Sequence, residues 1–193
     1  MKHFMIAFKV ALVTLILTGI IYPCVVTGIS QAIFPQKANG SMLTGDKGEL
    51  IGSELIGQAF VKPSYFQPRL SAAGNGFDAT SSGGSNLGPS SQKLRDRINA
   101  DTKRLLKENP AATGPVPVEL VTASASGLDP HISPEAAIWQ IPRIAASRNV
   151  SLERIKQIVM SMTKGRDFGI FGEPRVNILL INREMDKQFG KPY

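Results

Sequence analysis

The feature that most constrains this chain is a long uncharged stretch near its N-terminus. No charged side chain lies between Lys9 and Lys37, and the apolar part runs from Val10 to about Phe34. About 20 apolar residues are enough for a helix to cross the hydrocarbon core of a bilayer. Each Val, Leu, Ile or Phe in such a helix favours insertion by roughly 0.3–0.6 kcal/mol. The stretch therefore predicts a transmembrane helix at residues 10–33.

A cleaved signal peptide is the alternative interpretation of this stretch. The apolar core of a signal peptide is about 7–15 residues long, and Ser30 and Ala32 form a small-residue pattern suited to cleavage. The stretch is longer than that, so we expect an uncleaved span. Pro23 lies in its middle and predicts a kink, because proline removes one helical hydrogen bond.

The lysines that flank the span indicate its orientation. Lys2 and Lys9 precede it, whereas Lys37 alone follows it closely. Positive residues favour the cytoplasmic side, so the bulk of the chain is expected on the opposite side of the inner membrane. The predicted organisation is a cytoplasmic N-terminus at 1–9, the transmembrane helix at 10–33, a juxtamembrane linker at 34–48 and a soluble extracytoplasmic domain at 49–193.

Small residues inside the span suggest contact with other helices. Thr18, Gly19, Thr27 and Gly28 would let the backbone of a neighbouring helix approach closely. We therefore predict that these four residues pack on a helix of another subunit. A lone anchor that faces lipid is the alternative, because many such anchors also contain glycine.

The soluble part predicts a mixed α and β fold. Helical spacing of apolar residues predicts three helices, and short apolar runs predict two strands. Residues 63–91 are rich in Ser, Gly and Pro, and predict a long loop of a functional or flexible kind. The predicted helices are 91–109, 133–147 and 151–165, each begun by a capping serine, and the predicted strands are 116–122 and 176–181, the second followed by a short helical tail. Residues 50–57 are also expected to be extended. The apolar face of the third helix is expected at Leu152, Ile155, Ile158, Val159 and Met162.

Composition excludes several classes of function. One cysteine, Cys24, cannot form an intramolecular disulfide or a thiolate zinc cluster, and two histidines leave little room for a metal site. Lys and Arg number 22 against 15 Asp and Glu, without a block of like charge, so we expect no nucleic-acid partner. The charged face of residues 93–108 predicts a solvated helix, with docking to anionic lipid or an acidic partner as the alternative.

A glycine-rich loop is the candidate nucleotide site. Glycine backbone next to a helix N-terminus can cradle a phosphate group. The Gly-Lys-Ser/Thr ending of a P-loop is missing, so an ordered surface loop that touches a partner is the favoured alternative. The candidate nucleotide-binding residues are Ser82, Gly83, Gly84, Ser85 and Asn86.

Asp129 and His131 are the candidates for acid–base chemistry. An Asp and a His near serines could belong to a catalytic triad. The favoured interpretation is structural, with Asp129 turning the chain and His131 bonded to backbone at the start of a helix. We therefore predict no catalytic residue and no metal ligand in this chain.

Taken together, these stretches resemble one family, the C subunit of the Kdp-type potassium-transporting ATPase. The resemblance covers nearly the whole chain and departs from the family pattern at Leu70 and Ala125, which affects local loop shape. The matching segments are Tyr22–Pro23, Thr27–Gly28, Phe34–Pro35, Ala38–Ser41, Gly52–Ser53, Leu55–Gln58, Tyr65–Phe66, Ser71–Gly74, Ser82–Pro89, Leu120–Ser124, Ser126–Pro134 and Gly172–Asn177.

The resemblance implies a role in a bacterial inner-membrane pump that takes up K⁺ at the expense of ATP. It implies a channel-like A subunit, a P-type ATPase B subunit and a small F peptide as partners, besides membrane lipid. It also implies a soluble domain that is needed for assembly and acts as a catalytic chaperone, raising the ATP affinity of the B subunit. A direct role of that kind would need access to cytoplasmic nucleotide, whereas the lysine bias places the domain in the periplasm. The chain would have no cofactor of its own, and ATP enters through the resemblance alone.

Two other classes of protein stay open on sequence alone. One is a stand-alone membrane-anchored periplasmic binding protein or enzyme. The other is a subunit that faces the cytoplasm and binds nucleotide directly. The sequence Asp-Lys-Thr-Gly-Thr, which carries the phosphorylated aspartate of P-type pumps, does not occur in the chain.

Overall fold

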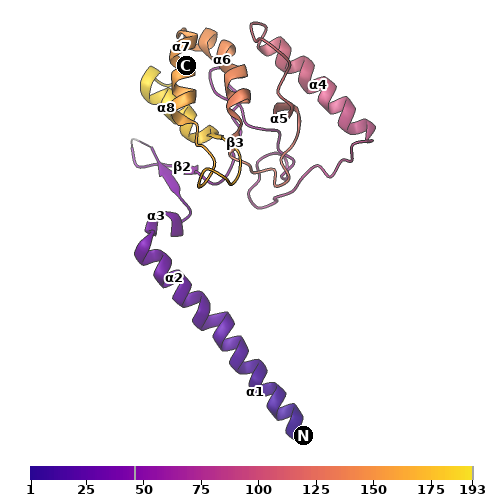
Figure 1. The fold of residues 1–193 in the computed structure, drawn as a ribbon, viewed down its shortest axis with the longest axis vertical. Helices are drawn as coiled ribbons and strands as arrows, with labels where there is room; N and C mark the ends of the chain where they lie inside the picture. The colour runs from indigo at the N-terminus through magenta and orange to yellow at the C-terminus, as the bar shows by residue number, and fades with distance from the viewer. Residues whose placement is uncertain (46, 193) are drawn as a thin grey trace. The chain divides into compact units, whose positions relative to one another are not determined.

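The uncharged N-terminal stretch forms one continuous helix. The computed structural model describes residues 1–45 and 47–192, and it divides this helix into α1 (Lys2–Ile16), η1 (Leu17–Ile21) and α2 (Tyr22–Ile33) (Figure 1). An 18-residue window of this helix has a mean hydropathy of 2.4, and by length and composition the helix can cross a membrane. The fold class predicted from the sequence, a soluble α and β part behind one apolar helix, is confirmed.

The irregularity in this helix lies directly before Pro23. Element η1 is a π-helical turn in which the Tyr22 N–H bonds to the Leu17 carbonyl. In a regular α-helix the proline ring would clash with the carbonyl four residues earlier, at Gly19. The wider π turn accommodates Pro23 without interrupting the helix.

A short helix and a hairpin complete the first compact unit, Met1–Ser53. Helix α3 (Pro35–Ala38) leads into strand β1 (Met42–Thr44), which pairs with β2 (Leu50–Ser53) in antiparallel fashion. The sequence predicted an irregular linker over much of this segment. The structure instead places a strand in it, because β2 supplies hydrogen-bond partners that composition alone does not reveal.

The second unit is Glu54–Tyr193, and its regular structure is mainly helical. Its two short strands, β3 (His131–Ile132) and β4 (Val176–Asn177), form an antiparallel pair (Figure 1). The helices are α4 (Gln92–Glu108), α5 (Val118–Val121), α6 (Pro134–Arg148), α7 (Leu152–Met162) and α8 (Ile178–Phe189).

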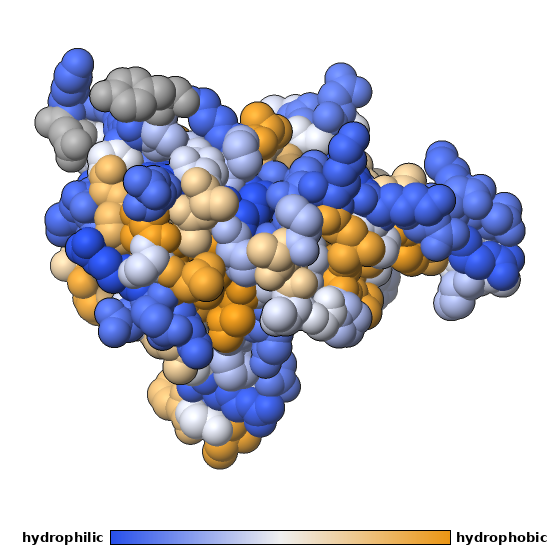
Figure 2. All heavy atoms as spheres, turned by 90° about the horizontal axis from the view of Figure 1, so that it is seen from above, coloured by the Kyte–Doolittle hydropathy of each residue, from blue (hydrophilic) through white to orange (hydrophobic). Residues whose placement is uncertain are grey.

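The core of this unit lies between α6, α7 and α8. The apolar face predicted for α7 is confirmed at Ile155, Ile158 and Val159, which are buried, whereas Leu152 is half exposed. Ile144 of α6 is fully buried in the same cluster. Hydrophilic side chains cover most of the face shown in Figure 2, with hydrophobic patches between them.

Capping residues begin two of the helices as predicted. The Ser91 hydroxyl oxygen accepts a hydrogen bond from the Leu94 N–H at 3.4 Å, and the Ser133 oxygen accepts one from Ala136 at 3.1 Å. Each bond satisfies a backbone donor that the first helical turn leaves without a partner. Ser151 occupies the same position before α7, but its side chain makes no capping bond.

One predicted strand is wrong, and another is too long. Residues 116–122 contain the single helical turn α5, where Leu120 and Val121 are both buried. A strand would send neighbouring side chains to opposite faces. Residues 176–181 form a strand only in β4, after which Asn177 caps α8 by accepting a hydrogen bond from the Leu180 N–H at 3.1 Å.

Two side-chain amides hold the irregular segment that precedes α4. The Phe66 N–H and carbonyl bond to Asn182 of α8 at 2.8 and 2.9 Å. The Gln67 N–H and carbonyl bond to Gln140 of α6 at 2.8 and 3.1 Å. Each amide thus takes the place of a peptide group in a neighbouring strand, and the predicted loop is ordered here.

Two arginines add to this network. The Arg143 guanidinium donates to the carbonyls of Pro63 and Tyr65 at 2.6 and 3.0 Å, and burial lowers its pKa to about 10. Arg148 pairs with Asp186 at 2.7 Å. The Tyr65 phenol also donates a hydrogen bond to Asp186. Burial and this hydrogen bond raise the pKa of the phenol to about 12. The segment is therefore fixed from both helices by charged as well as neutral groups.

Replacing Asn182 by Ala is expected to destabilise the chain. The Phe66 N–H and carbonyl would both stay buried without a partner, which costs roughly 2–5 kcal/mol of unfolding free energy. Thermal unfolding of the full chain in detergent measures the loss, and Asn99→Ala on the exposed side of α4 is the matched control. Equal stability of the two variants would contradict the assignment of a structural role to Asn182.

Candidate functional site

The glycine-rich loop predicted as a nucleotide site packs against residues 124–127. The Gly83 N–H and the Ser82 hydroxyl both donate to the Ser126 carbonyl, at 2.9 and 3.0 Å. A Cβ atom on Gly84 would lie 2.9 Å from the Ala125 carbonyl oxygen. Glycine is therefore required at this position because another backbone passes close to it.

The next helix along the chain begins several residues after this loop. Helix α4 starts at Gln92 and is capped by Ser91, so the loop at 82–86 does not run directly into its first turn. A phosphate cradle uses free N–H donors at a helix N-terminus. Two of the loop's donors already bind the chain itself, and nucleotide binding by Ser82, Gly83, Gly84, Ser85 and Asn86 stays a prediction.

A serine outside the predicted site joins a third loop to this contact. The Ser71 hydroxyl donates to the Gly127 carbonyl at 2.6 Å and accepts from the N–H groups of Ala73 and Phe77 at 3.2 and 2.8 Å. Gly127 has a φ of +69°, and a Cβ there would lie 2.6 Å from the Ala73 nitrogen. We call residues 71–77, 82–84 and 124–128 the three-loop cluster.

Asp129 forms the turn that the sequence predicted. Its Oδ1 accepts the His131 backbone N–H at 3.0 Å, and its Oδ2 pairs with the Arg69 guanidinium at 3.2 Å. Burial acts to raise the pKa of Asp129, but the hydrogen bonds from His131 and the charge of Arg69 outweigh it and hold the pKa below its ordinary value. Arg69, which sequence reasoning missed, thus adds to the effect of His131 in lowering the pKa of this carboxyl group.

Within residues 1–45 and 47–192, no hydrogen bond joins a serine hydroxyl to the His131 side chain. His131 Nδ1 lies 3.7 Å from Asp129 Oδ1, and strand β3 pairs its backbone with Asn177. The neighbouring Ser133 hydroxyl donates to Glu119 at 2.7 Å. Glu119 is a second residue that the sequence did not reveal, because its partner lies 14 residues further along. Residues 129–133 thus form a turn that Arg69 and Glu119 stabilise.

The small residues of the apolar helix are exposed along its surface. The Thr18 hydroxyl bonds back to the Thr14 carbonyl at 2.8 Å, and nothing lies within 4 Å of a Cβ built on Gly28. Pro23 has no N–H, so a carbonyl one turn earlier, at Thr18 or Gly19, loses its helical donor. In a bilayer such a group needs a donor from a neighbour. Packing of Thr18, Gly19, Thr27 and Gly28 on another helix stays a prediction.

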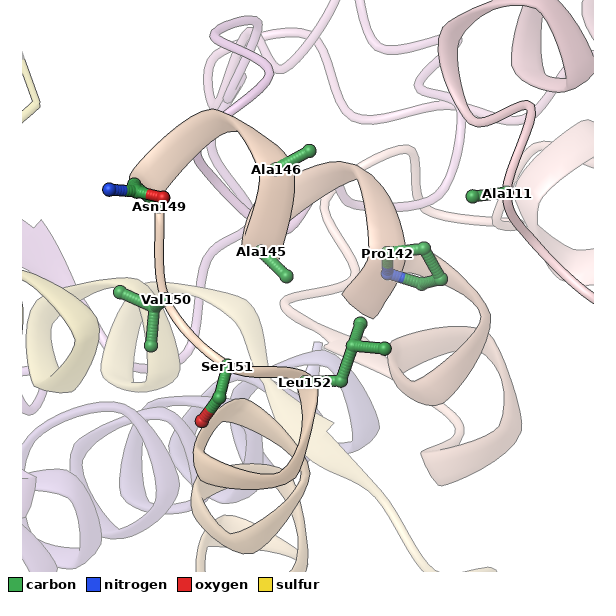
Figure 3. A pocket seen from close by; sticks show the side chains of 8 residues that line it. All are labelled: Ala111, Pro142, Ala145, Ala146, Asn149, Val150, Ser151 and Leu152. Atoms are coloured by element: carbon green, nitrogen blue, oxygen red, sulfur yellow. The ribbon is translucent and has the colours of Figure 1, made fainter.

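The hollows on the second unit, Glu54–Tyr193, which we call the soluble unit, include the following two. The larger has a volume of about 500 Å³, and its lining consists mostly of small apolar side chains (Figure 3). None of the lining residues is titratable: Ala111, Pro142, Ala145, Ala146, Asn149, Val150, Ser151 and Leu152. The smaller, of about 280 Å³, includes Trp139 and Glu135. Within residues 1–45 and 47–192, no cluster of three His, Cys, Asp or Glu could hold a metal ion.

Comparison with known proteins covers nearly the whole chain. The family model "K+-transporting ATPase, c chain" matches residues 4–187. A potassium-transporting ATPase KdpC subunit of Myxococcus xanthus is 54% identical over 97% of this chain and 89% of its own. Those of Rhodospirillum rubrum and Koribacter versatilis are 50% and 46% identical, over 90% and 96% of this chain and 90% and 94% of theirs.

Replacing Gly127 by Ala is expected to loosen the three-loop cluster. The left-handed φ and the close contact with Ala73 together cost about 2–4 kcal/mol of unfolding free energy. Gly88→Ala is the matched control, because nothing lies within 4 Å of a Cβ built there. Thermal unfolding of both variants tests the difference, and an unchanged midpoint for Gly127→Ala would show that the cluster tolerates the methyl group.

Proposed function

The chain belongs to the KdpC family, the c chain of the K⁺-transporting ATPase, and we propose that it is a non-catalytic subunit that stabilises the assembled pump. One observation carries this proposal: the long polar side chains inside the soluble unit bind the chain's own backbone. Arg143 donates to the carbonyl of Pro63, and Arg148 donates to that of Ser64 at 2.7 Å. Side chains held in this way maintain the shape of a surface, whereas acid–base catalysis needs a group within reach of substrate.

The proposed partners are a channel-like A subunit, an ATPase B subunit and a small F peptide of the same pump. The apolar helix Lys2–Ile33 supports a single-pass position in the inner membrane, in contact with lipid. Lys2 and Lys9 support a cytoplasmic N-terminus and therefore a periplasmic soluble unit.

We propose that any effect on the ATP affinity of the B subunit is indirect. A periplasmic unit cannot reach cytoplasmic nucleotide, and the Ser126 carbonyl already takes the donors of Ser82 and Gly83. A catalytic chaperone of this kind would act by coupling free energy through the complex, favouring the conformation of the B subunit that binds ATP.

Replacing His131 by Ala is expected to leave the ATPase rate of each intact complex within twofold of wild type. The reason is that His131 faces Asp129 and a strand partner, so its loss removes only local contacts. The rate is measured after size-exclusion purification, with Asp129→Ala as the comparison that removes the Arg69 pair. A hundredfold loss in normally assembled complexes would mean that His131 takes part in the reaction.

Replacing Gly28 by Leu is expected to reduce recovery of the complex about tenfold while the chain still inserts. A leucine would fill the space through which a neighbouring helix approaches. Val26→Leu is the matched control, since two residues correspond to about 200° around a helix. Recovery is the amount of the other subunits that co-purifies in mild detergent, and an unchanged amount would place Gly28 against lipid.

A further inference from the structure

The segment between α7 and β4 forms a hairpin of its own. Lys164 and Arg175 exchange two backbone hydrogen bonds of 2.8 and 2.9 Å, and Asp167 and Phe171 exchange two more of 2.8 and 2.9 Å. The Ile170 N–H closes the turn on the Asp167 carbonyl at 3.2 Å. We call residues 164–175 the apolar-tip hairpin. Its backbone is fixed at two levels, so the tip is held in one conformation.

Three large apolar side chains stand at the tip and touch little of the chain. Phe168 is 92% exposed, Ile170 72% and Phe171 65%. Burying a side chain of this size favours folding or binding by about 1.5–3 kcal/mol relative to leaving it in water. Single exposed apolar residues are ordinary, but a contiguous group of them marks an interaction surface.

Charged side chains flank this tip, and each of its basic groups has an acidic partner. Arg166 pairs with Glu173 at 2.7 Å, Arg175 pairs with Asp167 at 2.8 Å, and Lys164 approaches Asp167 at 3.5 Å. Attraction to an anionic membrane relies on clusters of unpaired basic residues. An apolar centre within a paired polar rim is instead the arrangement found in protein–protein interfaces.

The turn itself does not account for the phenylalanine at its apex. Phe168 has a φ of +53°, a left-handed conformation that bulky residues rarely adopt. Glycine or asparagine would fit that conformation with less strain. The aromatic ring must therefore contribute through something outside the hairpin, because within the chain it is almost fully exposed.

We propose that Phe168, Ile170 and Phe171 insert into an apolar pocket on another subunit of the same ATPase. This inference rests on the proposed function, since it names the surface through which the soluble unit would stabilise the pump. The hairpin is already ordered, so little conformational entropy is lost on docking. Aromatic side chains enclosed by a polar rim are the usual anchors of such interfaces.

Site-specific photo-crosslinking in the complete complex tests the contact directly. p-Benzoylphenylalanine replaces Phe168, the purified complex is irradiated, and the adduct is mapped by mass spectrometry. We expect one protein adduct, in an apolar segment of another subunit, and no adduct there from the same probe at Val61, which is 83% exposed. Adducts with lipid alone, or none, in a complex that still co-purifies would overturn the proposal.

Phe168→Asn separates docking from folding, because asparagine suits the left-handed turn. The thermal midpoint of the full chain in detergent is expected to stay unchanged or to rise, while recovery of the other subunits falls about tenfold. Val61→Asn is the matched control. Normal recovery for Phe168→Asn, or an equal fall for both variants, would overturn the inference. If the wild-type chain itself fails to co-purify with other subunits, the proposed function fails instead.

Discussion

The soluble unit depends on how it satisfies the backbone of an irregular segment, residues 63–67. This backbone lies inside the unit without a neighbouring strand, and buried peptide groups are costly without hydrogen bonds. Gln140 of α6 and Asn182 of α8 supply donors and acceptors from two different helices, and Arg143 donates to two further carbonyls. Neither helix can shift along its axis without breaking hydrogen bonds to this segment. A segment without helices or strands thus fixes the positions of α6 and α8.

That constraint determines which groups remain for contact with other subunits. The largest polar side chains of α6, among them Arg143 and Arg148, point inward and are engaged by backbone. The charged side chains of the apolar-tip hairpin likewise pair with one another. In the proposed assembly, apolar area and close packing then supply free energy that these engaged groups cannot. Such area is available at the hairpin tip and along the apolar N-terminal helix.

Sequence reasoning succeeded where a local signal decides the structure. The cap residues Ser91 and Ser133, followed by helical spacing of apolar residues, located the starts of α4 and α6. It failed at residues 116–122 and after Asn177 in the run 176–181, because short apolar runs suit a strand and a buried helical turn equally well. In the second case Asn177 was an available cap signal, since asparagine favours the residue before a helix.

The candidate site was less predictable, because the role of its glycine-rich loop depends on contacts between segments that are distant in the sequence. A glycine-rich loop serves equally well to approach a phosphate or to approach another backbone, and both uses leave the same composition. The bond from Gly83 to Ser126 spans more than 40 residues, and so does the contact of Gly84 with Ala125. No local pattern encodes either. In this chain Gly84 and Gly127 of the three-loop cluster are therefore explained by backbone packing, which gives the soluble unit a fixed surface of loops.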